Sequence, residues 1–132
     1  MMDGGGLDAL DRKVGRWTEP DEHGGVMIGD YLDGERDGEW RHLFTDGSVR
    51  SRGGFRRGRL HGDWVWHRTG GGLLQRGGFE DGEKHGLWER WDASGNQLDR
   101  GEWHRGKKVG EWTTFEPDGT VRRVTTHRSP VG

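Results

Sequence analysis

Histidines are the first residues in this chain that could do chemistry, because imidazole binds metals and transfers protons near neutral pH. The chain has seven of them. His61 and His85 stand 24 residues apart in similar surroundings. On neighbouring two-stranded units they would lie about 10 Å apart, whereas ligands of one zinc ion lie at ~2.0–2.1 Å from it. His42 and His67 also lack an evident third ligand. We therefore expect no metal site, and we expect His61 and His85 to be turn residues that hydrogen-bond the backbone.

Arginines form a column with the same interval. Arg52, Arg76 and Arg100 each precede a glycine and lie 24 residues apart. A row of guanidinium groups about 10 Å apart could bind the phosphates of lipid or RNA. The alternative is a solvated ladder in which each arginine pairs with an acidic residue on the next strand. The chain has 21 basic and 23 acidic residues, which favours the ladder.

Carboxylates form only a partial column, Glu39, Asp63 and Glu111, interrupted by Leu87. It could recognise a basic partner, or it could pair with the arginines. Catalysis finds little support, because the chain has no Cys and one Tyr, and no Gly-Lys-Ser/Thr run marks a phosphate loop. The net charge of −2 does not call for nucleic acid or an anionic membrane. We expect neither an enzyme nor a cofactor.

The elements that position these residues belong to a repeat. Self-similarity at a fixed period is the signature of a repeat array. Two aromatic series with a 24-residue interval are expected to form the structural core, namely Tyr31, Phe55, Phe79 and Trp103, and Trp40, Trp64, Trp88 and Trp112. Two glycine series follow the same interval, namely Gly34, Gly58, Gly82 and Gly106, and Gly38, Gly62, Gly86 and Gly110.

Each unit contains two short aromatic or β-branched runs separated by turns that contain glycine, a pattern typical of β-hairpins. We expect a two-residue turn at Asp46-Gly47 and its equivalents, because Asp-Gly tolerates positive φ at both central residues. A longer turn is expected from Asp33-Gly34 to Gly38. Gly54 and Gly78 stand beside two of the column residues and are expected to leave room for the rings.

Composition favours a single layer. Only 27% of the residues are hydrophobic, too few to fill a two-layer core, while eight Trp argue against disorder. The expected fold is all-β, a single-layer twisted antiparallel β-meander of about five 24-residue hairpin repeats. The repeat domain should span 10–127, with loose termini at 1–9 and 128–132. Its units lie near 10–28, 29–52, 53–76, 77–100 and 101–127, and the first is degenerate.

Aromatic residues outside the two series are candidates for partner binding. Strand alternation places Leu43, His67, Trp91 and Phe115 opposite the face of Trp40, whereas Trp66 shares the face of Trp64. Trp91 and Phe115 are then either turned inward by a bulge or packed at a rim, or they are exposed and mark an interaction site. The partner-binding candidates are Leu43, Arg52, Trp66, Arg76, Trp91, Arg100 and Phe115.

The pattern aromatic-x-x-Gly-x-x-x-Gly-x-Trp, with another glycine seven residues after the Trp, resembles the MORN repeat. It is most similar to the bacterial variant form, as in Gly62-Asp63-Trp64 and Gly86-Leu87-Trp88, and His61 and His85 match the histidine that is frequent before that glycine. The resemblance covers about 10–125. It departs from the family in its degenerate first unit and at Thr125, where a closing glycine would stand.

The resemblance implies an elongated β-meander with a binding role. Bacterial variant-type members include antitoxins, and eukaryotic-type members are linked to protein scaffolding and phospholipid binding. We therefore expect a protein–protein interaction module, in its sharper form an antitoxin-like or immunity-like partner of a bacterial toxin. The alternative is a scaffold that binds anionic phospholipid at a membrane surface. Met1–Leu10 does not resemble a secretory signal, so a cytoplasmic location is expected.

Overall fold

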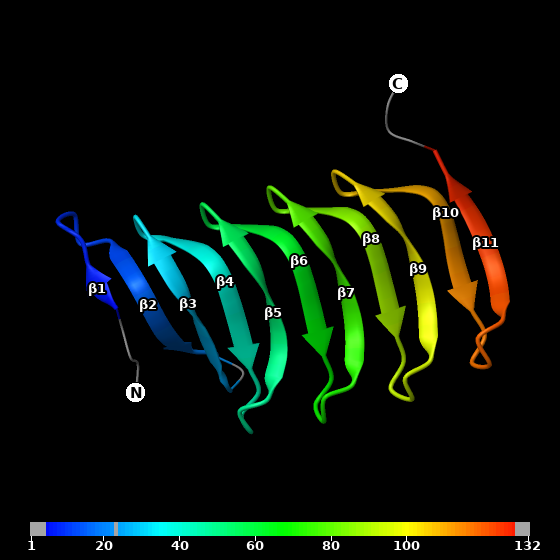
Figure 1. Ribbon diagram of the computed structural model, residues 1–132, viewed down its shortest axis with the longest axis horizontal. Coiled ribbons are helices and arrows are strands. Elements are labelled where there is room, and N and C mark those ends of the chain that lie inside the picture. Colours follow the sequence, from blue (N-terminus) through cyan, green and yellow to red (C-terminus); the bar gives the residue numbers. More distant parts are fainter. Residues whose placement is uncertain (1–4, 23, 129–132) are drawn as a thin grey trace.

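The described residues form one open antiparallel sheet of 11 strands, in which every strand pairs with its neighbours in the sequence (Figure 1). The computed structural model describes residues 5–22 and 24–128. The strands are β1 (Gly6–Leu7), β2 (Lys13–Pro20), β3 (Val26–Leu32), β4 (Glu35–Leu43), β5 (Val49–Arg56), β6 (Arg59–His67), β7 (Leu73–Glu80), β8 (Glu83–Trp91), β9 (Gln97–His104), β10 (Lys107–Phe115) and β11 (Val121–His127). The expected all-β meander is confirmed. Across the described ranges, no helix has the length and apolar character needed to cross a bilayer.

Two kinds of hairpin turn alternate along the chain. At Asp33-Gly34 both φ angles are positive, 51° and 81°, and Leu32 pairs directly with Glu35, so this is the two-residue turn. At Asp46-Gly47 only the glycine has a positive φ, and the loop is longer, closed by a 2.8 Å hydrogen bond from Phe44 N to Ser48 O. Our assignment of the short and long turns was therefore reversed.

The glycine that we expected in a turn lies inside a strand. Gly62 belongs to β6 and has a φ of 76°. Arg52 pairs with Val65 but Gly54 pairs with His61, so the register shifts at this point. Such a bulge bends the strand that carries it, and β4, β6 and β8 bend visibly in Figure 1.

Both aromatic series lie on one face of the sheet, which we call the ring face. Neighbouring rings meet edge to face, a preferred arrangement of aromatic pairs. The centroids of Phe79 and Trp88 are 5.2 Å apart with planes at 89°, and Tyr31 and Trp40 meet in the same way. Trp40, Trp64 and Trp88 are buried, although no second layer within the described ranges covers them. The core is this ladder of rings.

Lysine and arginine side chains complete the ladder. The Lys84 ammonium lies 4.7 Å from the ring centroids of both Trp88 and Trp103, and the Arg36 guanidinium lies 4.5 Å from that of Trp40. Long basic side chains cover aromatic surface with their stems while their charges stay in water. They supply part of the covering that a second layer would otherwise provide.

The glycine that leaves space for each indole is not the one that we expected. A Cβ added at Gly53 would lie 2.1 Å from Cδ2 of Trp64, so the indole occupies the space of the missing side chain. Its Nε1 donates a 2.9 Å hydrogen bond to the Gly54 carbonyl oxygen. Gly54 itself faces backbone, since a Cβ there would lie 2.6 Å from His61 O. The register shift makes Gly53 the residue beneath the ring.

The N-terminal end is held more firmly than expected. Leu7 pairs with Lys13 in the β1–β2 ladder, and Asp8 Oδ1 accepts hydrogen bonds from Leu10 N and Arg12 N. Residues 5–9 are therefore attached to the sheet rather than loose. Of the segments expected to be loose, 1–4 and 129–132 lie outside the described residues.

Candidate partner-binding face

A ladder of paired residues crosses the face opposite the rings, which we call the groove face. Cross-strand partners in an antiparallel sheet project to the same side. One unbroken row of such partners consists of Arg41, Arg52, Val65, Arg76, Glu89, Arg100 and Thr113. The three arginines of the predicted column therefore share one face.

A second row on the groove face carries the acidic column. Glu39, Asp63, Leu87 and Glu111 lie two residues before members of the first row, on β4, β6, β8 and β10. Glu39 and Asp63 are paired with Gly54 and Gly78 on the next strands. Since those glycines carry no side chain, gaps open beside the carboxylates on β5 and β7, whereas on β9 the equivalent residue is Glu102.

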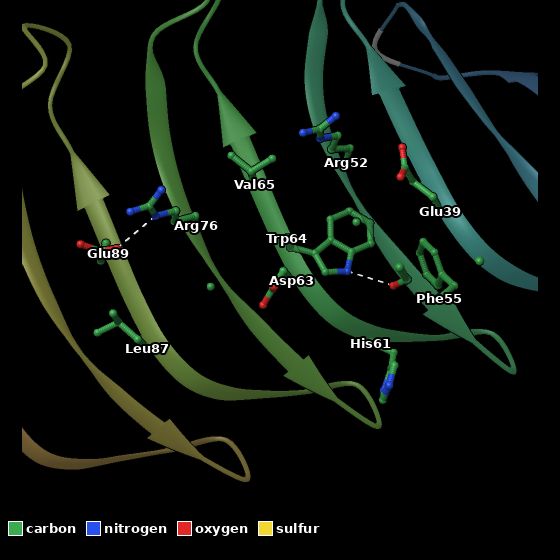
Figure 2. Close-up of a pocket in the computed structure, with 14 residues that line it drawn as sticks. Glu39, Arg52, Phe55, His61, Asp63, Trp64, Val65, Arg76, Leu87 and Glu89 are labelled. Carbon is green, nitrogen blue, oxygen red and sulfur yellow. Dashed lines mark hydrogen bonds and ion pairs between the residues drawn. The ribbon is translucent and has the colours of Figure 1, made fainter.

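These two rows enclose a groove of about 900 Å³ (Figure 2). Arg52, Val65 and Arg76 belong to its first row, and Glu39, Asp63 and Leu87 to its second. Backbone at Gly53, Gly54 and Gly77 also lines it, where the missing side chains let a ligand approach the sheet closely. The groove is open to solvent and mixes both signs of charge with two aliphatic side chains.

The charges in the groove are only partly paired with each other. Arg76 Nε lies 3.0 Å from Glu89 Oε1. Arg52 stands directly opposite Arg41, a like-charge pair that is unfavourable on adjacent strands. In the part of the chain that the structure describes, no carboxylate lies within 4.0 Å of either guanidinium, and the carboxylates of Glu39 and Asp63 have no basic group within that distance. Charges of both signs are thus available to a ligand.

Trp91 and Phe115 stay on the groove face and pack at its rim. The Arg76 guanidinium lies 5.3 Å from the Trp91 ring centroid, and the Arg100 guanidinium lies 5.9 Å from that of Phe115. Both rings are half-buried. Of the alternatives considered for Trp91 and Phe115, the one that fits is packing at a rim, here against arginine. Part of each ring remains accessible.

Leu43 and Trp66 lie on different faces. Leu43 is half-buried and follows Arg41 by two residues on β4, which places it on the groove face. Trp66 stacks on Trp64 with a centroid distance of 5.7 Å and approaches Trp88 to 5.5 Å. It belongs to the ring face, so the structure brings together six of the seven candidates and separates Trp66 from them.

The two histidines that we expected in turns lie in strands instead. His61 is in β6 and His85 in β8, three residues beyond the glycine of the short turn. The Nδ1 atoms of both are buried without a hydrogen-bond partner, while His85 Nε2 lies 3.4 Å from Glu80 Oε2. The short turn ends before the chain reaches these histidines. Their rings lie at the bulge that follows the turn.

The residues that our reasoning missed are Arg41, Val65 and Glu89. Each directly follows a Trp of the ring series, so strand alternation alone places it on the opposite face. This signal was present in the sequence.

Comparison of the chain with protein-family models finds no match. A search of curated proteins finds no match either.

Proposed function

We propose that this chain is a non-enzymatic protein-binding module that holds its partner on the groove face. The observation that supports this proposal most is the open groove of about 900 Å³, in which Arg52, Glu39 and Asp63 have no ion-pair partner among the residues that the structure describes. The buried rings that hold the sheet together project from the other face. A partner can therefore occupy the groove face without displacing any part of the core.

The partner surface that fits carries both acidic and basic side chains. Its carboxylates would meet Arg41 and Arg52 in charge-assisted hydrogen bonds, and its lysines or arginines would meet Glu39 and Asp63. Trp91 adds an amphipathic ring at the rim, a residue type common among the energetic centres of interfaces. Electrostatic complementarity of this kind gives specificity and rapid association.

The resemblance to bacterial MORN-variant repeats supports a sharper version of the proposal. Because members of that group include antitoxins, the partner would be a toxin that this chain masks in the cytoplasm. An antitoxin needs no catalytic group of its own. In that case the toxin should be the main protein bound to the chain.

Affinity capture from the native cells tests the proposal. The tagged chain should recover one partner in a stoichiometric amount. The double variant Arg52→Glu with Arg76→Glu should lose that partner while circular dichroism shows that it stays folded, although the loss of the Arg76–Glu89 ion pair lowers its stability. A matched control, Arg122→Glu with Arg123→Glu on β11, makes the same charge change outside the groove and should retain the partner. Recovery of no partner across growth conditions, or retention by the groove variant, would contradict the proposal.

Binding of anionic phospholipid is the second candidate, and the exposed column of Arg52, Arg76 and Arg100 supports it. Glu89 and Asp63 stand on the same face and oppose it, since an anionic surface repels carboxylates. Co-sedimentation with vesicles that contain phosphatidylserine separates the two candidates. Binding to lipid should weaken steeply with added salt and disappear in the groove variant, and an absence of binding at low salt removes this candidate.

A further inference from the structure

The turn that joins β1 to β2 begins a row of turns along one edge of the sheet (Figure 1), which we call the turn edge, and the four short turns follow it. Their charges alternate from one turn to the next. The first turn carries Asp33 and Glu35, the second Arg56, Arg57 and Arg59, the third Glu80, Asp81 and Glu83, and the fourth Arg105 and Lys107. The order of charge along the edge is therefore acidic, basic, acidic, basic.

The charges of the two central turns are exposed and do not pair with one another. All six side chains of the second and third turns belong to exposed residues. Within the described ranges, no ion pair of 4.0 Å or less joins one of these turns to the other. Among the described residues, the one ion-pair partner of these six side chains is His85, whose Nε2 lies 3.4 Å from Glu80 Oε2.

Alternation also serves the single chain, because neighbouring turns of opposite charge avoid repulsion. Glu35 leans over the second turn, where a Cβ added at Gly58 would lie 3.1 Å from its Oε2. Glu83 leans in the same way over Gly106 of the fourth turn. In the first turn Asp33 is also engaged, since Arg12 Nη2 of the β1–β2 turn lies 3.5 Å from Asp33 Oδ1. Arg56, Arg57 and Asp81 are exposed and have no ion pair among the described residues.

The order of charges is self-complementary under two-fold symmetry. When a second copy approaches with its edge reversed, the first turn of one copy faces the fourth of the other, and the second faces the third. Every acidic turn then meets a basic turn. A parallel approach in register would set like charges against each other, and a parallel approach shifted by one turn would leave one turn of each copy unmatched. Two-fold contacts are isologous and are the commonest in homo-oligomers.

We propose that the turn edge is a docking surface for a second copy of this chain, with the two-fold axis between the second and third turns. The contact is electrostatic, so it should be fast, specific and sensitive to salt. It leaves the groove face of both copies free. The proposal is therefore independent of the partner-binding function.

Sedimentation velocity over a range of protein concentrations tests it. The wild type should dimerise at low salt and become monomeric as salt is added. Two variants exchange the native turn sequences. Arg56→Glu with Arg57→Asp and Arg59→Glu makes the second turn identical to the third, and Glu80→Arg with Asp81→Arg and Glu83→Arg does the reverse. Each should weaken self-association by about tenfold or more.

The decisive measurement is made on a mixture of the two variants. In a mixed dimer, the acidic second and third turns of one variant face the basic third and second turns of the other. The equimolar mixture should dimerise like the wild type, and a chain that carries both exchanges should again dimerise with itself. The control Arg16→Glu with Arg122→Glu and Arg123→Glu makes an equal charge change away from the turn edge and should dimerise normally. Circular dichroism confirms that every variant is folded. A wild type that stays monomeric at low salt, or variants that fail to rescue each other, would overturn the proposal.

Discussion

The indole of Trp88 occupies the space in which a side chain on Gly77 would lie. A Cβ added at Gly77 would stand 2.0 Å from Trp88 Cδ2, and Trp88 Nε1 donates a 3.0 Å hydrogen bond to the carbonyl oxygen of Gly78. Each strand that carries a buried Trp thus needs a glycine on the strand before it. On β11 the corresponding residue is Thr125. Its side chain fills the space that an indole would occupy, so β11 cannot pack against another strand of this kind in the same way.

Substitution of Gly77 by alanine should destabilise the protein by about 2–3 kcal/mol, because overpacking forces the indole off its site. Urea unfolding measures this change. Gly72→Ala is the matched control, since a Cβ there has no atom within 4 Å, and it should leave the free energy of unfolding nearly unchanged. Equal effects of the two substitutions would contradict the packing of Trp88 on Gly77.

Removal of the ring itself should have a larger effect. Trp88 is 4% exposed, so Trp88→Ala should reduce the free energy of unfolding by about 3–5 kcal/mol. The adjacent Leu87 is 52% exposed on the opposite face, and Leu87→Ala should cost less than about 0.5 kcal/mol. A loss below about 1 kcal/mol for the Trp88 variant would show that the ring face is not the core.

The short turns should respond to the type of residue at their first central position. Arg105 has a φ of 48°, a conformation that Asn tolerates and β-branched residues avoid. Arg105→Asn should therefore stabilise the protein slightly, whereas Arg105→Val should destabilise it by about 1 kcal/mol or more. Thermal unfolding at high salt, where charge effects are screened, distinguishes the two. A Val variant as stable as the Asn variant would be incompatible with this turn.

Stability in acid should depend on Glu19, which accepts hydrogen bonds of 2.7 Å from Lys13 Nζ and 2.6 Å from Tyr31 Oη. Burial alone would raise the pKa of Glu19, but these two hydrogen bonds hold it below its ordinary value of 4.5. A carboxylate with a depressed pKa stabilises the folded state above its unfolded pKa, and this contribution is lost as the pH falls through the folded pKa.

The difference in unfolding free energy between wild type and Glu19→Gln should therefore be largest near pH 7 and should shrink toward pH 3. Urea unfolding at several pH values measures it. A difference that stays constant across this range would show that the Glu19 carboxylate is not stabilised by Lys13 and Tyr31.

Strand order and the two ring series follow from the sequence because they depend on local features. Trp64 and Phe79 recur with their neighbours at a constant interval, and strand alternation decides the face on which each lies. The turns were harder to assign, because Asp33-Gly34 and Asp46-Gly47 are the same dipeptide. The difference between them is the pairing of the flanking residues, which depends on the whole ladder.

The identity of the glycine beneath each indole also depends on that ladder. Gly53 and Gly54 are equivalent as residues, and only the shift of register at the Gly62 bulge decides that Trp64 lies on Gly53. The groove depends on the next ladder, between β6 and β7, which aligns Asp63 with Gly78 and opens the gap beside it. Local patterns therefore predicted the columns, while their exact alignment required the structure.

Both proposals depend on a sheet that is a single layer, with neither face covered by the chain itself. Eleven strands spaced ~4.8 Å apart make a ribbon about 48 Å long, whereas a compact globule of 132 residues has a radius of gyration of about 14 Å. Small-angle X-ray scattering at high salt, where the turn edge is screened, measures this radius directly. The open ribbon should give about 16–17 Å, and a value near 14 Å would contradict the single layer and both proposals with it.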